Sequence, residues 1–239
     1  MVCGVVLSNI IDSKSNSSSC FNNRVSFARA LRDDKNKTKI QRQNTPPLRK
    51  ATEVNRILAD HGATCGPDRE HPLVELNVVD VDLPEIQEVD TIAIAKDKVI
   101  LGAQLVNGPC LVEDTSLQFH ALGGMPGPYI KWFQERLKPV GLYNILEAYP
   151  DQKTATAVCT LAFCPAPHAD PVLFTGECHG TIVPPEPGRG FGWDSIFVPD
   201  VVAKEGGGGD GAASAPGGLT FSQMTTEEKC ELSHRGKAV

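Results

Sequence analysis

Residues 92–114 read IAIAKDKVILGAQLVNGPCLVED, and this stretch decides the predicted fold class. Apolar residues at positions 92, 95, 99 and 103 recur at helical spacing, which predicts a helix over residues 92–105. The apolar run at residues 110–112 predicts a short buried strand that carries Glu113 and Asp114 at its carboxyl end. A further strand is predicted before the helix, over residues 74–81. Strand, helix and strand in this order predict a crossover unit and a mixed α/β body.

Helices and strands continue to alternate on both sides of this unit. Val54, Ile57 and Leu58 predict a short amphipathic helix, and Thr225 with Glu228 has the order of a capping box at the start of another. The remaining predicted elements are helices over residues 129–137 and 141–148, and two antiparallel strands over residues 155–164 and 172–183.

The chain has two compositional parts. Residues 1–44 form a basic, Ser- and Asn-rich leader, which is typical either of a disordered segment or of an organellar transit peptide. Residues 45–239 form the predicted globular body, interrupted at residues 204–218 by a Gly-rich insertion that we expect to be a flexible loop. Cytoplasmic localisation is expected, with organellar targeting by the leader as the alternative.

Charge and cysteine usage exclude several classes of protein. The net charge is −6 although residues 1–50 carry ten Lys or Arg against three Asp or Glu, so the body is strongly acidic. An acidic body argues against nucleic-acid binding, which needs several Lys or Arg contacts to phosphates. No apolar run approaches the ~20 residues that span a bilayer. The eight cysteines are dispersed without a CxxC pair, so all are expected to be reduced, as in an intracellular protein.

Three groups of residues carry candidate chemistry. Carboxylates at 85, 113 and 114, with a lysine at 96, could hold a cation, provided that a turn presents residues 113 and 114 to one side; a solvated acidic turn is the alternative. The run FGWD at residues 191–194 could stack on a nucleobase, or could be a packed aromatic turn. The run SHR at residues 233–235 is either part of a site or a solvated helix terminus.

Taken in order, these segments resemble the inosine triphosphate pyrophosphatase family. The matching stretches are LPE at 83–85, LVEDT at 111–115, ALGGMPGPYIKWF at 121–133, FGWD at 191–194 and SHR at 233–235. The resemblance implies an α/β protein with an elongated mixed β-sheet, flanking helices and two lobes with a cleft between them. It also implies a homodimer that hydrolyses noncanonical purine nucleoside triphosphates (ITP, dITP, XTP) to the monophosphate and pyrophosphate, with Mg²⁺ (or Mn²⁺) as cofactor.

The resemblance assigns roles to individual residues. Glu85 and Glu113 would help to hold the metal with Asp114, which would also orient or deprotonate the attacking water. Phosphate oxygens would be neutralised by Lys50, Lys96 and Lys229. The base would be bound by Phe191, Gly192, Trp193 and Asp194, with His234 and Arg235 at the purine 6-oxygen and Lys131 at the edge of the cleft.

Two departures from the family pattern support an alternative. Where the family has a Thr-Gly-Asn-x-x-Lys phosphate loop, this chain has Thr45-Pro46-Pro47 followed by Leu48, Arg49 and Lys50, and proline lacks the N–H that would bind phosphate. The family's last helix also extends beyond the point that matches Val239, so exposed apolar surface is expected there. The alternative is a catalytically weak, nucleotide-binding or dimerising relative.

Overall fold

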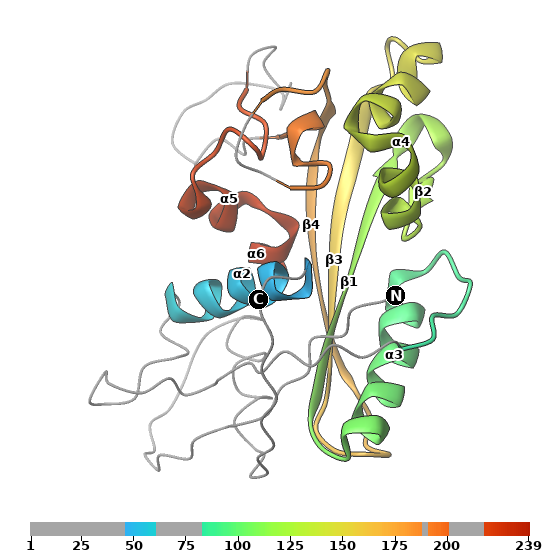
Figure 1. The fold of residues 1–239 in the computed structure, drawn as a ribbon, viewed down its shortest axis with the longest axis vertical. Coiled ribbons are helices and arrows are strands. Elements are labelled where there is room, and N and C mark those ends of the chain that lie inside the picture. Colours follow the sequence, from blue (N-terminus) through green and yellow to red (C-terminus); the bar gives the residue numbers. More distant parts are fainter. Residues whose placement is uncertain (1–45, 61–82, 188–190, 201–217) are drawn as a thin grey trace, which may run out of the picture. The chain divides into compact units, whose positions relative to one another are not determined.

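Five strands of the computed structural model form one sheet, in the order β2-β1-β3-β4-β5 (Figure 1). The structure describes residues 46–60, 83–187, 191–200 and 218–239. The strands are β1 (Cys110–Phe119), β2 (Pro126–Gly127), β3 (Thr154–Cys164), β4 (Val172–Ile182) and β5 (Phe197–Pro199). β1 pairs antiparallel with β2, and β4 with β5. The α/β fold class is confirmed, and the described sheet is antiparallel rather than mixed.

The helices are α2 (Pro46–Asp60), α3 (Thr91–Val106), α4 (Ile130–Asn144), α5 (Thr226–Leu232) and α6 (His234–Ala238). Short 3-10 helices cover His120–Leu122, Ile145–Ala148 and Asp194–Ile196. No helix of the described residues is long and apolar enough to cross a membrane. The predicted leader, the strand at 74–81 and nearly all of the Gly-rich insertion lie outside the described residues.

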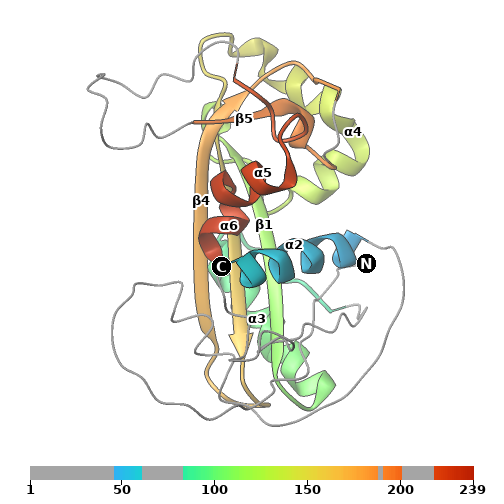
Figure 2. The same ribbon diagram turned by 90° about the vertical axis from the view of Figure 1, so that its left-hand side faces the viewer.

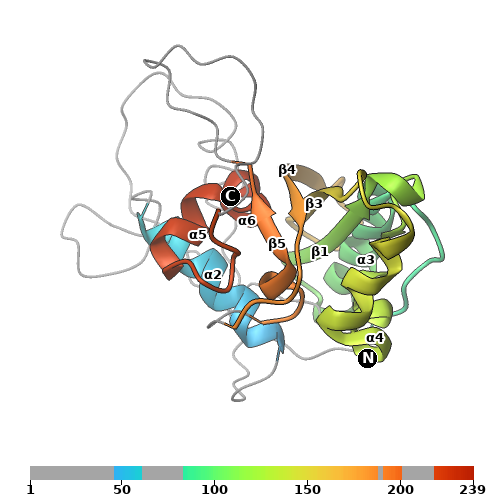
Figure 3. The same cartoon turned by 90° about the horizontal axis from the view of Figure 1, so that it is seen from above.

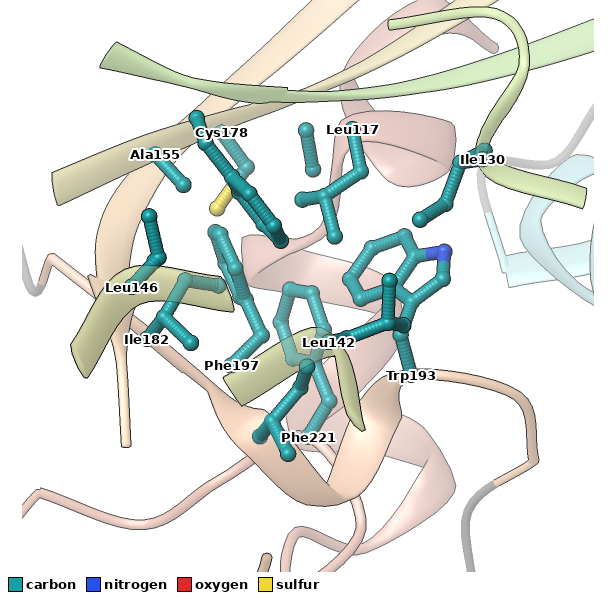
Figure 4. Close-up of a cluster of buried hydrophobic side chains, with 13 residues drawn as sticks. Leu117, Ile130, Leu142, Leu146, Ala155, Cys178, Ile182, Trp193, Phe197 and Phe221 are labelled. Atoms are coloured by element: carbon teal, nitrogen blue, oxygen red, sulfur yellow. The ribbon is translucent and has the colours of Figure 1, made fainter. Parts of the chain in front are cut away.

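The described chain divides into two compact units. The first contains the described residues up to Asp114, together with Thr160–Thr175 and Ala238–Val239. Its core joins α3 to β1 and β3 through eight buried residues: Leu83, Ala95, Val99, Ala103, Cys110, Val112, Ala162 and Cys164. The second contains Thr115–Cys159 and Gly176–Lys237, and its core gathers aromatic and aliphatic residues that include Leu117, Trp193, Phe197 and Phe221 (Figure 4).

Helix α3 forms where the sequence predicts it, but the residues on its buried face differ in part from the predicted ones. The Asp90 carboxylate caps the helix by accepting a hydrogen bond of 2.8 Å from the Ile92 N–H, and Asn107 ends it in a left-handed conformation (φ 50). Ile92 was expected to be in the core and is 46% exposed. Ile94 and Lys98 take part in the buried face instead, because they lie one turn apart on it.

Strand β1 is longer than predicted, and this changes the position of two acidic residues. The predicted strand ended at residue 112, with Glu113 and Asp114 in a turn, whereas β1 continues through both to Phe119. Both carboxylates are buried, so the alternative of a solvated acidic turn is wrong as well. The residues after Asp114 are largely apolar or small and are buried in turn, which sustains the strand.

Helix α2 begins at Pro46 and Pro47, in the stretch where the resemblance implies a phosphate loop. Proline fits the first turn of a helix, where its missing N–H would have no helical partner. Ala51, Val54 and Ile57 are buried, which confirms the predicted amphipathic helix. Pro46 and Pro47 are therefore helical, while Thr45 lies outside the described residues.

The two helices predicted at residues 129–137 and 141–148 are confirmed as one kinked segment. Helix α4 breaks at Lys138, which has a left-handed φ of 58 before Pro139, and continues into the 3-10 helix Ile145–Ala148. Proline 139 explains the break, because its ring excludes the preceding residue from a helical conformation.

Candidate active site

Two consecutive residues of β1, Glu113 and Asp114, carry the buried carboxylates of the first unit. Successive side chains of a strand point to opposite faces of a sheet. In agreement, the Lys50 ammonium of α2 lies 3.4 Å from Glu113 Oε1, and the Lys98 ammonium of α3 donates a hydrogen bond of 3.0 Å to Asp114 Oδ1. Figures 1 and 3 show α2 and α3 on opposite sides of the strands. The two carboxylates therefore face different helices.

Lys98 links Asp114 to a third carboxylate, Glu85. Its side chain is 1% exposed, and its ammonium forms ion pairs with both Asp114 and Glu85. The residue of this helix that the family resemblance assigns to the site is Lys96, and Lys96 is exposed. The signal for Lys98 was its spacing, because it stands four residues after Ile94 and four before Gly102, on the buried face of α3.

The environment of this ion pair shifts the pKa of both partners. Burial acts to lower the pKa of Lys98, but the charges of Asp114 and Glu85 outweigh burial and raise it, so Lys98 is a cation. Burial raises the pKa of Asp114, and Lys98 opposes that shift. A carboxylate with a raised pKa is a better proton acceptor than an ordinary aspartate when it is ionised.

The predicted metal ligands are not gathered into one group. Among the described residues no three His, Cys, Asp or Glu side chains are placed to hold a metal ion together. Glu113 is separated from the other two carboxylates because it faces α2. Glu85 and Asp114 do converge, and Asp114 Oδ2 is buried without a hydrogen-bond partner. Carboxylate oxygens suit a hard divalent cation, so this pair fits such an ion in donor chemistry.

The second unit contains the base-binding candidates, and Asp194 organises them. Asp194 Oδ2 accepts hydrogen bonds from the Lys229 ammonium at 2.8 Å and from the Phe191 backbone N–H at 2.9 Å. Lys229 lies on α5, whose start is fixed by the predicted capping box: Thr225 Oγ1 accepts from the Glu228 N–H, and the Glu228 carboxylate accepts from the Thr225 N–H. The prediction of the capping box is confirmed.

The aromatic residues of the FGWD stretch separate into two environments. Trp193 is buried in the core against Phe197 (Figure 4), and its ring centroid lies 5.5 Å from that of Phe197 and 5.5 Å from that of His234. Phe191 is half-buried, and the Lys229 ammonium lies 5.0 Å from its ring centroid. Gly192 between them has a φ of 71, which favours glycine. Trp193 thus matches the packed aromatic turn, while Phe191 is half-buried with the Lys229 ammonium over its ring.

The Ser233-His234-Arg235 stretch is buried, which contradicts the alternative of a solvated helix terminus. The three residues are 2%, 2% and 3% exposed. Ser233 separates α5 from α6, and its hydroxyl accepts a hydrogen bond of 3.1 Å from the Gly236 N–H. Figures 1 and 2 show the two helices following one another beside β4, where the Lys237 ammonium donates to the Glu177 carbonyl.

The last two residues of the chain are buried. Helix α6 continues to Ala238, and Ala238 and Val239 are both buried. Lys131, the remaining predicted site residue, lies in the first turn of α4, with its ammonium 5.0 Å from the ring centroid of Trp132.

Comparison with known proteins shows which family the chain resembles over most of its length. The profile of the Ham1 family matches residues 45–239. An inosine triphosphate pyrophosphatase of Puccinia graminis f. sp. tritici is 40% identical over 190 residues, which cover 80% of this chain and 88% of the relative. An inosine triphosphate pyrophosphatase of Tuber melanosporum is 42% identical over 191 residues, which cover 80% of this chain and 87% of the relative.

Solved structures agree on the fold. A nucleoside-triphosphatase / dITP/XTP pyrophosphatase from Mycobacterium abscessus superposes with a TM-score of 0.53 at 27% identity, covering 82% of this chain and 92% of its own. A HAM1 protein from Coxiella burnetii reaches 0.56 at 21% identity, with 82% and 91% covered, and supports the fold alone. Because the family profile spans most of the chain and the sequence relatives are about as long as the match, the chain belongs to the Ham1 family, the inosine triphosphate pyrophosphatases that its motifs resemble.

Proposed function

We propose that this protein hydrolyses noncanonical purine nucleoside triphosphates such as ITP, dITP and XTP to the monophosphate and pyrophosphate. Water adds to the α-phosphorus, the bond from that phosphorus to the oxygen bridging the β-phosphate breaks, and pyrophosphate leaves. The observation that carries the proposal is the buried Asp114 carboxylate, with one oxygen on Lys98 and the other without a partner, in a chain of this family. The weak or inactive relative is not favoured by the names of the sequence relatives.

Asp114 is the proposed general base. Its unpartnered Oδ2 can accept a proton from water, and its raised pKa strengthens it as an acceptor once it is ionised. Lys50 and the exposed Lys96 are proposed to neutralise phosphate oxygens. The Lys50 ammonium lies 3.4 Å from Glu113 Oε1, so this carboxylate of β1 helps to hold it in place.

Glu85 and Asp114 are the residues proposed to hold a divalent cation, with Glu113 as a further ligand that the resemblance assigns. The family is generally dependent on a divalent metal, and we propose Mg²⁺. When bound, the cation offsets the negative charge of the triphosphate and of the leaving pyrophosphate.

The second unit supplies groups suited to a purine. The half-buried ring of Phe191 can stack on the base, and Asp194 holds the Phe191 backbone in place through its N–H. His234 and Arg235 carry N–H groups that can donate to the 6-oxygen of hypoxanthine or xanthine. Facing the 6-amino group of adenine, the same N–H groups would meet donors, so the site is proposed to reject ATP.

The experiment is pyrophosphate release from ITP, dITP, XTP and ATP by the purified protein with Mg²⁺ present. We expect release from the three 6-oxo nucleotides to exceed release from ATP. Arg235→Ala should lower the rate with ITP far more than the rate with ATP, while Arg136→Ala, an exposed arginine on α4, serves as the matched control. Equal losses for both nucleotides in Arg235→Ala would place this arginine on the phosphates, and no release from any of the four would refute the proposed activity.

A homodimer in the cytoplasm is the proposed biological form. Supporting dimerisation, three large apolar side chains of α4 lie on the surface: Trp132, Leu137 and Val140. Light scattering after gel filtration should give twice the mass of the chain, and Trp132→Glu should shift it toward the monomer.

A further inference from the structure

Lys98 holds the position that a bound cation would need. It is a buried lysine whose ammonium pairs with both Glu85 and Asp114, the two carboxylates that converge in the first unit. Its surroundings on α3 and β1 are apolar: Val99, Ala95 and Val112 are all fully buried. A buried ammonium is retained only where anionic partners offset its loss of water.

A divalent cation and this ammonium compete for the same oxygens. Each positive charge is stabilised by the same pair of carboxylates, and two cations at such short range repel one another more strongly in a buried site than in water. Among the described residues, Asp114 Oδ2 is the only buried carboxylate oxygen without a hydrogen-bond partner, and one oxygen is too small a donor set for a divalent ion, which takes six or more. We therefore expect the ion to compete for the carboxylate oxygens that the ammonium holds.

We propose that Lys98 is an exchangeable internal counter-cation: a divalent ion binds by displacing the Lys98 ammonium from Glu85 and Asp114. The proposal rests on the proposed function in that it concerns the same metal-dependent site. Glu85 is 27% exposed at its side chain, so the pair has one end open to solvent. A lysine ammonium is a point charge on a flexible chain, which allows it to move between acceptors.

Exchange of this kind couples the metal to the nucleotide. Without nucleotide, the displaced ammonium loses two carboxylates and gains only water, so the free protein should bind the ion weakly. A triphosphate offers anionic oxygens as new acceptors, and charge-assisted hydrogen bonds to them are among the strong ones in proteins. Bound nucleotide should therefore raise the affinity for the metal, and Lys98 should be the residue through which part of this coupling acts.

The test measures metal binding without any turnover. Mn²⁺ is titrated into the nucleotide-free protein and free Mn²⁺ is read by electron paramagnetic resonance, for the parent chain, Lys98→Met and Lys98→Gln. Both variants remove the competing charge, and we expect the dissociation constant to fall by about tenfold or more. Lys138→Met is the control, since it removes an exposed lysine of α4 to which no role in the site is assigned, and it should leave the constant within about twofold.

Thermal melting gives a second, independent readout. Removing Lys98 leaves Glu85 and Asp114 without their shared cation, so both variants should melt lower than the parent without metal, and saturating Mn²⁺ should restore most of the loss. If the variants fold only with Mn²⁺, the inference is supported. If the variants fail to fold at every Mn²⁺ concentration, Lys98 is needed for stability in a way that the metal does not replace, and the inference is wrong.

The outcome is separable from that of the proposed function. Unchanged or weaker Mn²⁺ binding in Lys98→Met and Lys98→Gln overturns the exchange, even if the parent releases pyrophosphate from ITP. Tighter Mn²⁺ binding in both supports it, even if the parent hydrolyses none of the tested nucleotides.

Discussion

Each buried lysine that carries the argument is explained by a carboxylate on another element. Lys98 of α3 reaches Asp114 of β1, and Lys229 of α5 reaches Asp194. Motifs point to Asp114 and Asp194, and the family resemblance points to Lys229, but the sequence alone does not pair them, because pairing depends on contacts between distant segments. Lys98 was missed for the same reason: a lysine within an apolar helical pattern is read as exposed until its partner is known.

Asp114→Asn tests the residue proposed to accept the proton. The amide keeps the shape of the side chain but cannot take a proton from water, so turnover of ITP should fall by about 10²- to 10⁴-fold. Pyrophosphate release under substrate saturation measures this, and circular dichroism should show an unchanged fold. Asp97→Asn, a change at a half-buried carboxylate of α3, is the control. Turnover equal to that of the parent would remove Asp114 from the mechanism.

Lys229→Met tests the ion pair in the second unit. The change leaves the buried Asp194 carboxylate with the Phe191 N–H but without its cation, and breaking a buried pair costs about 3–5 kcal/mol of unfolding free energy. Urea denaturation measures the loss. Adding Asp194→Asn removes the uncompensated charge, so the double variant should recover part of the lost unfolding free energy. A loss below about 1 kcal/mol, the range of surface pairs, would contradict the burial of this pair.

At the scale of elements, the local sequence pattern predicts which helices and strands exist better than it predicts where they begin and end. Residues 155–164 and 172–183 alternate and became β3 and β4 with nearly the predicted bounds. β1 is longer than predicted because Glu113, Asp114 and Ser116 are polar in sequence but buried in the sheet, and tertiary contacts such as Lys98 with Asp114 offset the cost of burying them. The prolines at 46 and 47 predict a phosphate loop without two of its N–H donors, whereas the structure places both in the first turn of α2, which accommodates them.

The packing of α3 on β1 leaves no room for a side chain at Gly102. A Cβ there would lie 2.6 Å from Cys110 Sγ and 3.5 Å from a methyl group of Leu83. Gly102→Ala should therefore lower the unfolding free energy by about 1–3 kcal/mol, despite alanine's better helix propensity. Gly108→Ala, where the nearest atom is 3.8 Å away, is the matched control, and it should change stability by about 0.5 kcal/mol or less.

Relief of the same contact provides the decisive comparison for Gly102. Cys110→Ala removes the sulfur that a Cβ at position 102 would meet. Gly102→Ala should therefore lower the unfolding free energy less in the Cys110→Ala background than in the parent. Thermal melting of the four proteins measures this coupling. If the two single changes are simply additive, the loss at Gly102 does not come from Cys110.

At the scale of the whole molecule, the two compact units share their long strands. β1 leaves the first unit after Asp114, β3 enters it at Thr160, and β4 leaves it after Thr175. No local pattern in the sequence marks these boundaries, since a strand that belongs to two cores has the same alternation throughout. The family resemblance implied two lobes, and the compact units agree in number with that expectation.

Shared strands predict that the two units unfold together, and buried thiols can report this. Cys110 and Cys164 lie in the first unit, and Cys178 lies in the second; all three are reduced, as predicted for the whole chain. Burial raises the pKa of Cys110 to about 12 and that of Cys178 to about 11, and it also raises the pKa of the Cys164 thiol. A raised pKa keeps a thiol protonated, and only the thiolate is alkylated at a useful rate.

At pH 8, therefore, a thiol with a pKa of 11 is ionised in about one molecule in a thousand, and its burial further restricts the reagent. We expect iodoacetamide to leave Cys110, Cys164 and Cys178 unmodified in the native protein and to modify all three fully in guanidinium chloride, which is the positive control. Across a guanidinium series, peptide mass spectrometry should give one common midpoint for the three residues, because strands that serve both cores cannot lose one core and keep the other. If Cys178 became reactive at a clearly lower concentration than Cys110 and Cys164, the second unit would unfold alone, and the shared strands would not couple the units.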